Sequence, residues 1–374
     1  MTVPEIPRTM KAQFLDAYRQ PYSFRDAEVP ATSSPHDLLV KVDAAGYCHT
    51  DATLVAGHFA PNPPSFPHIG CHEFAGTVVK LSEGASPAAK NFPVGTRVGI
   101  PSCSFHPCGT CFECTKEAGP DSDAPGYSVY CAHALSIGVD QHGGFAEYAL
   151  ADARQVVKIP DGFSSVDTAP MMCAGMTIYA ALKKCDPQPG RTVGIMGCGG
   201  GLGHLGLQFA TKMGMAVVGV DAADQPVELA ESLSTGAWIV DARKETANAV
   251  VKELGRREGK KDRGEMGVDC IVILTESQKA FDYGVQLVKN HGTVVVVSYP
   301  VNGFNISAMD IVARKISFVG CLLSSNKLAT EMLEFAANNG VKAVQRRYPL
   351  SDLNRLVEEY HRTPGGKLVV DMSM

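Results

Sequence analysis

The chain has 374 residues, of which 45% are hydrophobic and 20% are charged, and its net charge at pH 7 is −5. This length allows two domains, each with its own hydrophobic core. The slightly acidic balance gives no electrostatic reason to expect a nucleic-acid partner, and no apolar run reaches the ~18 residues of a membrane span. The first residues lack a basic segment followed by an apolar one, so we expect a cytoplasmic protein.

The first 150 residues or so are rich in glycine and proline and contain short apolar runs. Strands are predicted at residues 38–42, 76–79 and 97–100. The proline-rich stretch 61–67 is predicted to be a loop, because proline supplies no backbone donor. This part of the chain is therefore predicted to form a compact, mostly β domain.

Strands and helices alternate in the second half of the chain. The predicted strands cover residues 191–197, 216–220, 238–240, 268–274, 293–298 and 316–320. The predicted helices cover residues 176–184, 202–213, 227–233 and 279–289. This alternation indicates a parallel sheet with crossover helices, and six such strands fit a doubly wound dinucleotide-binding domain. The tail differs, with predicted helices at 328–337 and 353–360 and a strand at 368–370.

A glycine-rich loop follows the first of these strands and opens a helix, a context in which backbone amides can approach a pyrophosphate. Its residues are Gly197, Gly199, Gly200, Gly201, Leu202 and Gly203. A strict G-x-G-x-x-G pattern from Gly197 fails, because its sixth position is Leu202. Asp221 ends the next strand, where an acid bonds the ribose hydroxyls of NAD and would repel a 2′-phosphate. We therefore predict NAD, with NADP as the alternative.

Four of the twelve cysteines form a cluster with metal-ligand spacing. The predicted ligands of a closed, structural zinc site are Cys108, Cys111, Cys114 and Cys131. Nearby Cys103 and His106 are substitutes for Cys108 that would break the repeated spacing. The isolated residues Cys185, Cys270 and Cys321 lie in or beside apolar segments and are predicted to be separate buried thiols.

Cys48 and His72 offer a thiolate and an imidazole, which are ligand types that suit zinc. Cys173 is the best third ligand, since it lies where the two predicted domains meet in the chain. Three ligands leave a fourth position open, as a catalytic zinc requires, and two cysteines with one histidine are the set that alcohol dehydrogenases use. The sequence thus predicts two zinc ions per chain.

These motifs together resemble the zinc-containing alcohol dehydrogenases of the medium-chain dehydrogenase/reductase superfamily, over essentially the whole chain. The resemblance is carried by residues 46–51, 72–76, 173–175 and 200–203, by Asp221 and by the cysteine cluster. It implies a GroES-like (chaperonin-10-like) catalytic domain, residues 1–174 and 323–374, and a Rossmann domain, residues 175–322. It also implies hydride transfer between a nicotinamide cofactor and an alcohol, aldehyde or ketone, by a homodimer or homotetramer.

The resemblance assigns roles to single residues at the predicted catalytic zinc. It implies that Cys48, His72 and Cys173 hold the ion, with Glu73 as an occasional ligand. Thr50 matches the hydroxyl that contacts the substrate oxygen and passes its proton.

Further roles lie just outside the ligand set. Asp51 resembles the acid that orients the zinc-ligand histidine. His49 and Lys367 stand where the family contacts the cofactor phosphates.

Three departures from the family pattern bear on the reaction. Thr53 stands where many members have a histidine that relays the proton to solvent, so we expect direct solvent access or a substitute such as His49. Cys71 replaces a common glycine and puts a spare thiol beside His72, either packed away or an alternative ligand. Ethanol-oxidising members line their substrate pocket with tryptophans, but the only tryptophan here, Trp238, lies in the Rossmann half. Phe59 lies near one of the positions that those members fill with tryptophan. This difference points to a substrate larger than ethanol.

Two other function classes compete with an alcohol dehydrogenase or with a reductase in specialised small-metabolite biosynthesis. A reductase of activated C=C bonds is one, but many such members lack the catalytic zinc ligands. A non-catalytic cofactor-binding scaffold is the other, and it would need neither the three ligands nor Thr50.

Overall fold

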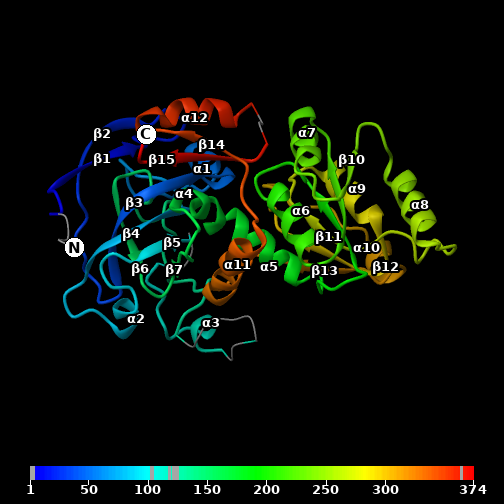
Figure 1. The fold of residues 1–374 in the computed structure, drawn as a ribbon, viewed down its shortest axis with the longest axis horizontal. Coiled ribbons are helices and arrows are strands. Elements are labelled where there is room, and N and C mark those ends of the chain that lie inside the picture. The colour runs from blue at the N-terminus through cyan, green and yellow to red at the C-terminus, as the bar shows by residue number, and fades with distance from the viewer. Residues whose placement is uncertain (1–4, 102–104, 117–118, 120–125, 363–364) are drawn as a thin grey trace. The chain divides into compact units, whose positions relative to one another are not determined.

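The computed structural model describes residues 5–101, 105–116, 119, 126–362 and 365–374 and divides into two compact units (Figure 1). The first unit is formed by Met1–Met176, Leu323–Arg362 and Lys367–Met374. The second is formed by Thr177–Leu322 with a short segment around Gly365 and Gly366. Each unit has its own buried apolar core.

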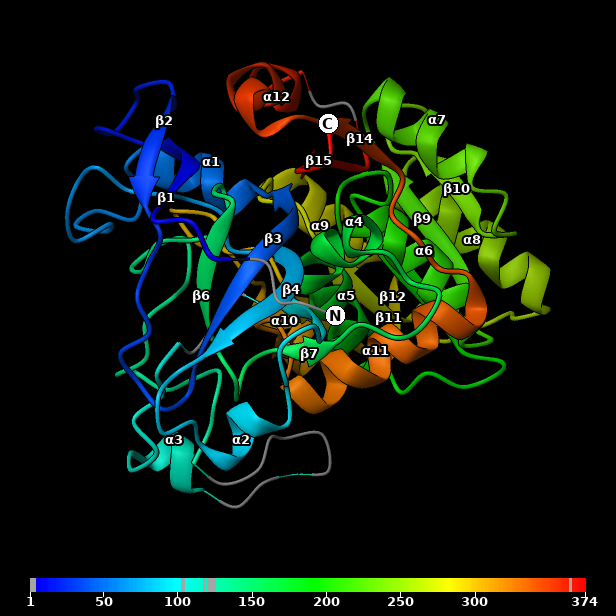
Figure 2. The same ribbon diagram turned by 60° about the vertical axis from the view of Figure 1, so that its left-hand side comes forward.

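The first unit is built on a seven-stranded sheet in the order β14-β15-β3-β4-β5-β7, with β6 paired to β3. Its strands are β3 (Asp37–Tyr47), β4 (Phe74–Leu81), β5 (Arg97–Ile100), β6 (Tyr148–Asp152), β7 (Val157–Lys158), β14 (Gln345–Tyr348) and β15 (Lys367–Asp371). All pairings are antiparallel except β14 with β15. The long strand β3 is central and pairs with β4, β6 and β15, the first two of which lie beside it in Figure 2. A separate hairpin joins β1 (Thr9–Phe14) to β2 (Ser23–Glu28).

Short helices and turns surround this sheet. They are α1 (His49–Val55), α2 (Pro87–Lys90), α3 (Phe112–Thr115), α4 (Ser165–Thr168), η1 (Ala169–Met172), η2 (Leu350–Asp352), α11 (Asn326–Asn339) and α12 (Leu353–Tyr360). The longest, α11, begins where the Ser325 hydroxyl accepts the Leu328 amide and ends at Gly340, whose φ of +67° favours glycine. The C-terminal strand β15 pairs with the end of β3 and thus places Lys367 close to Tyr47.

The second unit is a six-stranded parallel sheet in the order β10-β9-β8-β11-β12-β13. Its strands are β8 (Thr192–Met196), β9 (Ala216–Asp221), β10 (Trp238–Asp241), β11 (Val268–Ile273), β12 (Val288–Val296) and β13 (Ser317–Gly320). The chain starts in the middle, winds outward to β10, and returns through β11 to the other edge. This is the doubly wound order that the alternation of strands and helices predicts.

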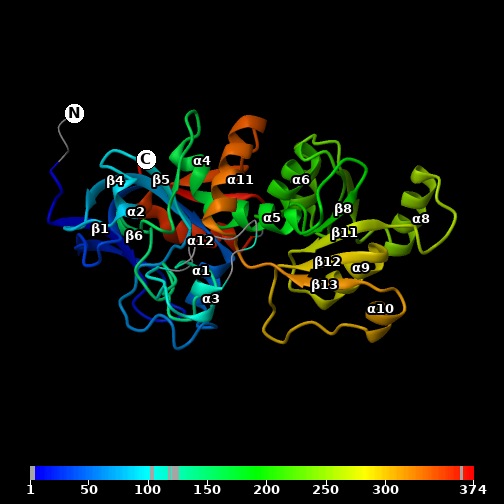
Figure 3. The same cartoon turned by 90° about the horizontal axis from the view of Figure 1, so that it is seen from below.

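Helices connect these strands and cover the sheet. They are α6 (Gly203–Lys212), α7 (Asp224–Ser232), α8 (Ala247–Glu258), α9 (Gln278–Leu287) and α10 (Ala308–Val312), while α5 (Ala174–Lys183) lies where the first unit gives way to the second along the chain. Figure 3 shows α9 beside β12, which it contacts. Among the described residues, none of the helices combines the length and apolarity that crossing a bilayer would take.

The structure corrects one expectation about the isolated cysteines. Cys185, just after α5, and Cys270, on β11, are joined in a disulfide across 85 residues of sequence. Their Cα atoms are 5.4 Å apart, a distance that is usual for a disulfide. The prediction of two separate thiols was therefore wrong. A contact between residues so far apart in the sequence leaves no local spacing pattern from which it could have been predicted.

Candidate active site and metal centres

The first cluster of metal-binding side chains is assembled around Asp51 in the first unit. Cys48 follows β3 and caps helix α1, where its amide donates to the Asp51 carboxylate at 2.9 Å. The other oxygen of Asp51 accepts the amide of Cys71 at 3.0 Å. One buried carboxylate thus holds the two backbone segments that carry Cys48 and His72 side by side.

Four potential ligands converge there: Cys48, His72, Glu73 and Cys173 offer ligand atoms that all lie within 4.8 Å of one another. The sulfurs of Cys48 and Cys173 are 3.9 Å apart. Two thiolates bound to one tetrahedral zinc at ~2.3 Å would be separated by roughly 3.8 Å. The spacing of the sulfurs therefore fits a shared zinc ion.

The polar atoms of His72 support the same reading. Its Nδ1 lies 3.7 Å from Asp51, and among the described residues its buried Nε2 has no hydrogen-bond partner. A buried imidazole nitrogen without a partner carries a desolvation cost that a metal ion would remove. The donor set, two sulfurs and one imidazole nitrogen, is also the one that suits zinc.

The electrostatics of the cluster favour a cation. The hydrogen bond from the Cys173 thiol lowers the pKa of Cys48 well below its usual value and raises that of Cys173. Burial raises the pKa of Glu73 to about 7. A bound metal ion would keep both thiols ionised, as zinc ligation requires.

Lys367, which is predicted to contact a cofactor phosphate, is paired with Glu73 in this structure. Its ammonium is buried, forms an ion pair with Glu73 and donates to the carbonyl of Tyr47 at 3.0 Å. Burial opposes its charge, but the negative charges of Glu73, Cys48 and Cys173 together outweigh burial and raise the pKa of Lys367. The structure thus shows this charge beside the metal cluster, and the contact of Lys367 with a cofactor phosphate stays a prediction.

The second cluster contains the four cysteines with repeated spacing. The sulfurs of Cys108, Cys111, Cys114 and Cys131 lie within 4.8 Å of one another. Two of the separations, Cys111 to Cys131 at 3.9 Å and Cys108 to Cys131 at 3.7 Å, again match thiolates on one tetrahedral zinc. Backbone amides of Thr110 and Cys111 lower the pKa of Cys108 to about 6. The cluster fits a closed, four-thiolate zinc site.

His106, one of the two substitute ligands, does not enter this cluster. The Nε2 atom of His106 lies 2.6 Å from the buried carboxylate of Asp37, and its amide donates to Asp152. Cys103, the other substitute, lies outside the described residues.

The glycine loop connects β8 to α6 in the second unit. Gly197 has a φ of +85°, and a Cβ atom on Gly199 would lie 1.9 Å from the Pro226 carbonyl oxygen. The Asp221 carboxylate, at the end of β9, accepts the Gly199 amide at 3.0 Å. The acid predicted to contact the ribose therefore lies directly against the loop predicted to contact the pyrophosphate.

Comparisons with known proteins agree with this arrangement. Residues 34–161 match the family described as alcohol dehydrogenase GroES-like domain, and residues 201–338 match zinc-binding dehydrogenase. An alcohol dehydrogenase of Geobacillus stearothermophilus is 34% identical over 97% of this chain and 99% of the relative. The chain belongs to the zinc-binding alcohol dehydrogenase family. It is accordingly an oxidoreductase that interconverts alcohols and carbonyl compounds.

Other relatives extend the comparison. Alcohol dehydrogenase 1 of Emericella nidulans is 33% identical over 94% of this chain and 95% of its own. The crystal structure of the Aeropyrum pernix alcohol dehydrogenase has a TM-score of 0.80 at 27% identity and covers 96% of this chain and 99% of that one. A zinc-binding dehydrogenase of Sinorhizobium meliloti, solved with NADP, has a TM-score of 0.80 at 26% identity, with 97% and 99% covered.

The residues after Cys48 give this dehydrogenase its particular features. The Thr50 hydroxyl lies 3.9 Å from the Cys48 sulfur, while His49 is exposed and its Nδ1 is 2.9 Å from the Tyr360 hydroxyl. The Thr53 hydroxyl donates to the carbonyl of His49 at 2.9 Å and so stays on its own helix. No sequence pattern pointed to Tyr360, which reaches this site from the last turn of α12.

Cys71, the spare thiol beside His72, is directed away from the metal cluster. Its side chain is fully buried, and its sulfur lies 3.4 Å from the carbonyl oxygens of both Gly46 and Glu73. Burial raises its pKa well above the usual value, which keeps it a thiol. Cys71 has a φ of +79°, a backbone conformation that explains why glycine is common at this position.

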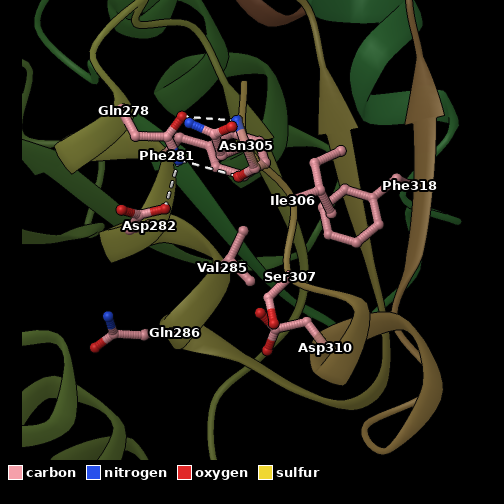
Figure 4. Close-up of a pocket in the computed structure, with 10 residues that line it drawn as sticks. All are labelled: Gln278, Phe281, Asp282, Val285, Gln286, Asn305, Ile306, Ser307, Asp310 and Phe318. Carbon is pink, nitrogen blue, oxygen red and sulfur yellow. Dashed lines mark hydrogen bonds between the residues drawn. The ribbon is translucent and has the colours of Figure 1, made fainter. Parts of the chain in front are cut away.

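A cavity of about 500 Å³ lies elsewhere in the second unit, between α9, the 305–310 segment and β13 (Figure 4). Gln278 spans its rim by hydrogen bonds to Asp282 and to the backbone of Asn305. None of the predicted site residues lines this cavity, which therefore has no place in the proposed chemistry.

Proposed function

We propose that this enzyme binds zinc through Cys48, His72 and Cys173 and uses NAD to oxidise an alcohol or reduce the corresponding carbonyl compound. One observation carries the proposal: two thiol sulfurs 3.9 Å apart and a buried, unpartnered imidazole nitrogen converge beside the Thr50 hydroxyl. When bound, zinc supplies Lewis acidity toward the substrate oxygen, and the nicotinamide accepts or donates the hydride. The Glu73 carboxylate adds a negative charge beside the ligand set, and the Lys367 ammonium balances it.

The chain's own residues position the substrate and move its proton. The Thr50 hydroxyl hydrogen-bonds the substrate oxygen and passes the proton on. Asp51 fixes the orientation of His72 through the hydrogen bonds that tie the two backbone segments together. Thr53 has no basic group near neutral pH, so the proton leaves Thr50 for solvent.

The cofactor preference rests on Asp221. Its carboxylate lies at the glycine loop, where it suits ribose hydroxyls and repels a 2′-phosphate. We therefore assign NAD as the preferred cofactor and NADP as the weaker one. A strong preference for NADPH would contradict the role given to this residue.

The substrate is proposed to be larger than ethanol. The single tryptophan, Trp238, stacks against Arg257 at 3.9 Å on β10 and is not available to narrow a substrate pocket. Retention of all three zinc ligands favours alcohol or carbonyl chemistry over reduction of a C=C bond.

The proposal is tested by measuring NADH and NADPH oxidation with a panel of aldehydes and ketones, together with zinc analysis. We expect about two zinc ions per chain, activity with NADH, and higher kcat/KM for long or aromatic aldehydes than for acetaldehyde. A Cys173→Ser variant should lose one zinc and the activity, whereas Cys111→Ser should lose one zinc and stability. One zinc or none in the parent enzyme would contradict the two-site assignment.

A homo-oligomer is proposed from the free edge of the second unit. Strand β13 pairs only with β12 among the described strands, and the segment before it exposes Val301, Met309 and Val312 to 85%, 68% and 79%. An unpaired edge beside exposed apolar side chains is typical of an association surface. Light scattering should show a dimer or tetramer, and a Val301→Asp/Val312→Asp variant should be monomeric. A monomeric parent would overturn this part of the proposal.

A further inference from the structure

We propose that Tyr360 is a positioning residue for cofactor binding, which acts by fixing the tautomer and orientation of His49. The two atoms are 2.9 Å apart, and in this proposal the Tyr360 hydroxyl donates to Nδ1 of His49, so that the imidazole proton is held on Nε2 and can be donated to a phosphate oxygen of the dinucleotide. The inference rests on the proposed use of NAD and on His49 as a phosphate contact. It adds a residue, Tyr360, that no sequence motif selects.

The contact joins two distant parts of the chain within the first unit. His49 is the first residue of α1 and Tyr360 the last of α12, and 311 residues of sequence separate them. Their side chains meet at 2.9 Å, from the hydroxyl oxygen to Nδ1. Helices α1 and α12 lie close together in both Figure 1 and Figure 3.

The phenol ring of Tyr360 is held by a buried neighbour. It packs edge-on against the ring of Tyr47, with the centroids 5.0 Å apart. Tyr47 is itself buried and stacks with Phe145. Because Tyr47 immediately precedes Cys48 at the end of β3, the strand that delivers the zinc ligand also sets the position of Tyr360. The hydroxyl direction is therefore fixed by the core and not by a mobile surface side chain.

The chemistry of imidazole gives this contact its consequence. A neutral imidazole has one N–H donor and one acceptor nitrogen, and the partner of one nitrogen decides the state of the other. A phosphate oxygen only accepts. With Tyr360 donating to Nδ1, the neutral ring has its donor on Nε2, as phosphate binding requires. The Thr53 hydroxyl adds a hydrogen bond to the carbonyl of His49 and steadies the backbone beneath the ring.

A Tyr360→Phe variant separates this role from packing, because phenylalanine keeps the ring against Tyr47 and removes only the hydroxyl. We expect a dissociation constant for NADH, measured by fluorescence titration of the zinc-loaded enzyme, about three- to tenfold above that of the parent, as loss of one neutral hydrogen bond implies. Zinc content and Tm should not change. Tyr283→Phe is the matched control, since it also removes a tyrosine hydroxyl that makes a hydrogen bond, here to the backbone carbonyl of Glu245; it should bind NADH like the parent.

A double-mutant cycle with His49→Ala tests whether Tyr360 acts through His49. We expect His49→Ala to weaken NADH binding and the added Tyr360→Phe change to have no further effect. Additive losses, or a Tyr360→Phe variant with unchanged NADH affinity, would overturn the positioning role alone. Unchanged affinity in His49→Ala would overturn the phosphate contact itself and with it the proposal.

The tautomer can be read without turnover. In ¹⁵N spectra of histidine-labelled enzyme at pH 8.5, the His49 ring should show its proton on Nε2 in the parent and a mixture of tautomers in Tyr360→Phe. A parent ring with its proton on Nδ1 would overturn the proposal. This measurement does not depend on NAD binding, so a failure of the proposed cofactor assignment would be recognised separately.

Discussion

Glu73 and Lys367 form an ion pair whose side chains are 0% and 4% exposed, directly beside the sulfurs of the proposed catalytic zinc site. Because both side chains are buried, each charge depends on the other for stabilisation. The pair links β15, the last strand of the chain, to the residue that follows His72. Through it, Lys367 influences the charge of the metal cluster.

Replacing Lys367 by methionine should lower the free energy of unfolding by roughly 3 kcal/mol, near the lower end for a broken buried ion pair. The loss is moderated because burial raises the pKa of Glu73 to about 7 and the carboxyl can take up a proton. In the variant the folded state holds this proton to higher pH than the unfolded state does, so the loss should grow between pH 6 and 8. Denaturant unfolding at both pH values measures it.

The control for this variant is Lys342→Met, which breaks a half-exposed pair with Asp167. It should cost less than about 1 kcal/mol, as surface pairs usually do. Equal losses in the two variants would show that the buried pair has no special role.

His68 makes the stability of the first unit depend on pH. Burial lowers its pKa from 6.5 to about 4, and its Nε2 donates to the Gly138 carbonyl at 3.0 Å. The folded state therefore keeps His68 neutral while the unfolded chain binds a proton below about pH 6.5. Stability from this residue is complete above that pH and should fall by roughly 3 kcal/mol as the pH drops to 4. His142, whose pKa is also lowered by desolvation, adds to the same trend.

A His68→Gln variant, which retains a donor, should lose less stability than the parent between pH 7 and 5. Urea unfolding at the two pH values gives the difference. The exposed His58→Gln variant should keep the parent's pH dependence. Parallel behaviour of His68→Gln and the parent would show that the acid sensitivity arises elsewhere.

Much of the fold could be predicted because local patterns encode it. In the second unit each of the six strands contains a short apolar run, and the first is followed by Gly197, which has a positive φ. Helix α8 was not predicted, although Thr246 caps its start and Gly259, with φ of +68°, ends it. Its apolar positions alternate with charges, which hid the helical period. Strand β12 begins at Val288, whereas the predicted strand begins at residue 293. The additional residues lie beyond a register shift in the pairing of β12 with β11.

The residues of the candidate site also fall into those that the sequence could predict and those that it could not. The metal clusters could be predicted because thiols and imidazole are unusual side chains with characteristic spacing. The partners of Lys367, His49 and Cys185 could not, because each contact joins segments that only the tertiary fold brings together. For Lys367, position in the chain indicated a phosphate, and only the pairing of β15 with β3 shows the buried carboxylate that it meets.

Two adjacent glycines of the loop should respond differently to alanine. A Cβ on Gly199 would lie 1.9 Å from the Pro226 carbonyl oxygen, whereas one on Gly200 would lie 3.4 Å from the Gly197 carbonyl oxygen. Gly199→Ala should therefore destabilise the enzyme by about 1–3 kcal/mol, as overpacking does, and Gly200→Ala by less. Differential scanning fluorimetry measures the stability, and NADH titration of Gly200→Ala tests whether the backbone must approach a pyrophosphate. Similar Tm values for the two variants would contradict the packing argument.

The disulfide between Cys185 and Cys270 should contribute to the stability of the second unit. Closing a loop of 85 residues in the unfolded chain is worth roughly 4.6 kcal/mol in the entropic account. In denaturant, two more thiols should titrate after reduction than before, and the Cys185→Ala/Cys270→Ala variant should unfold at lower urea concentration than the parent. Cys321→Ala, at a buried cysteine outside the disulfide, should lose less. An unchanged thiol count after reduction would show that the two sulfurs remain thiols, and the variant would then lose only the packing of two small buried side chains.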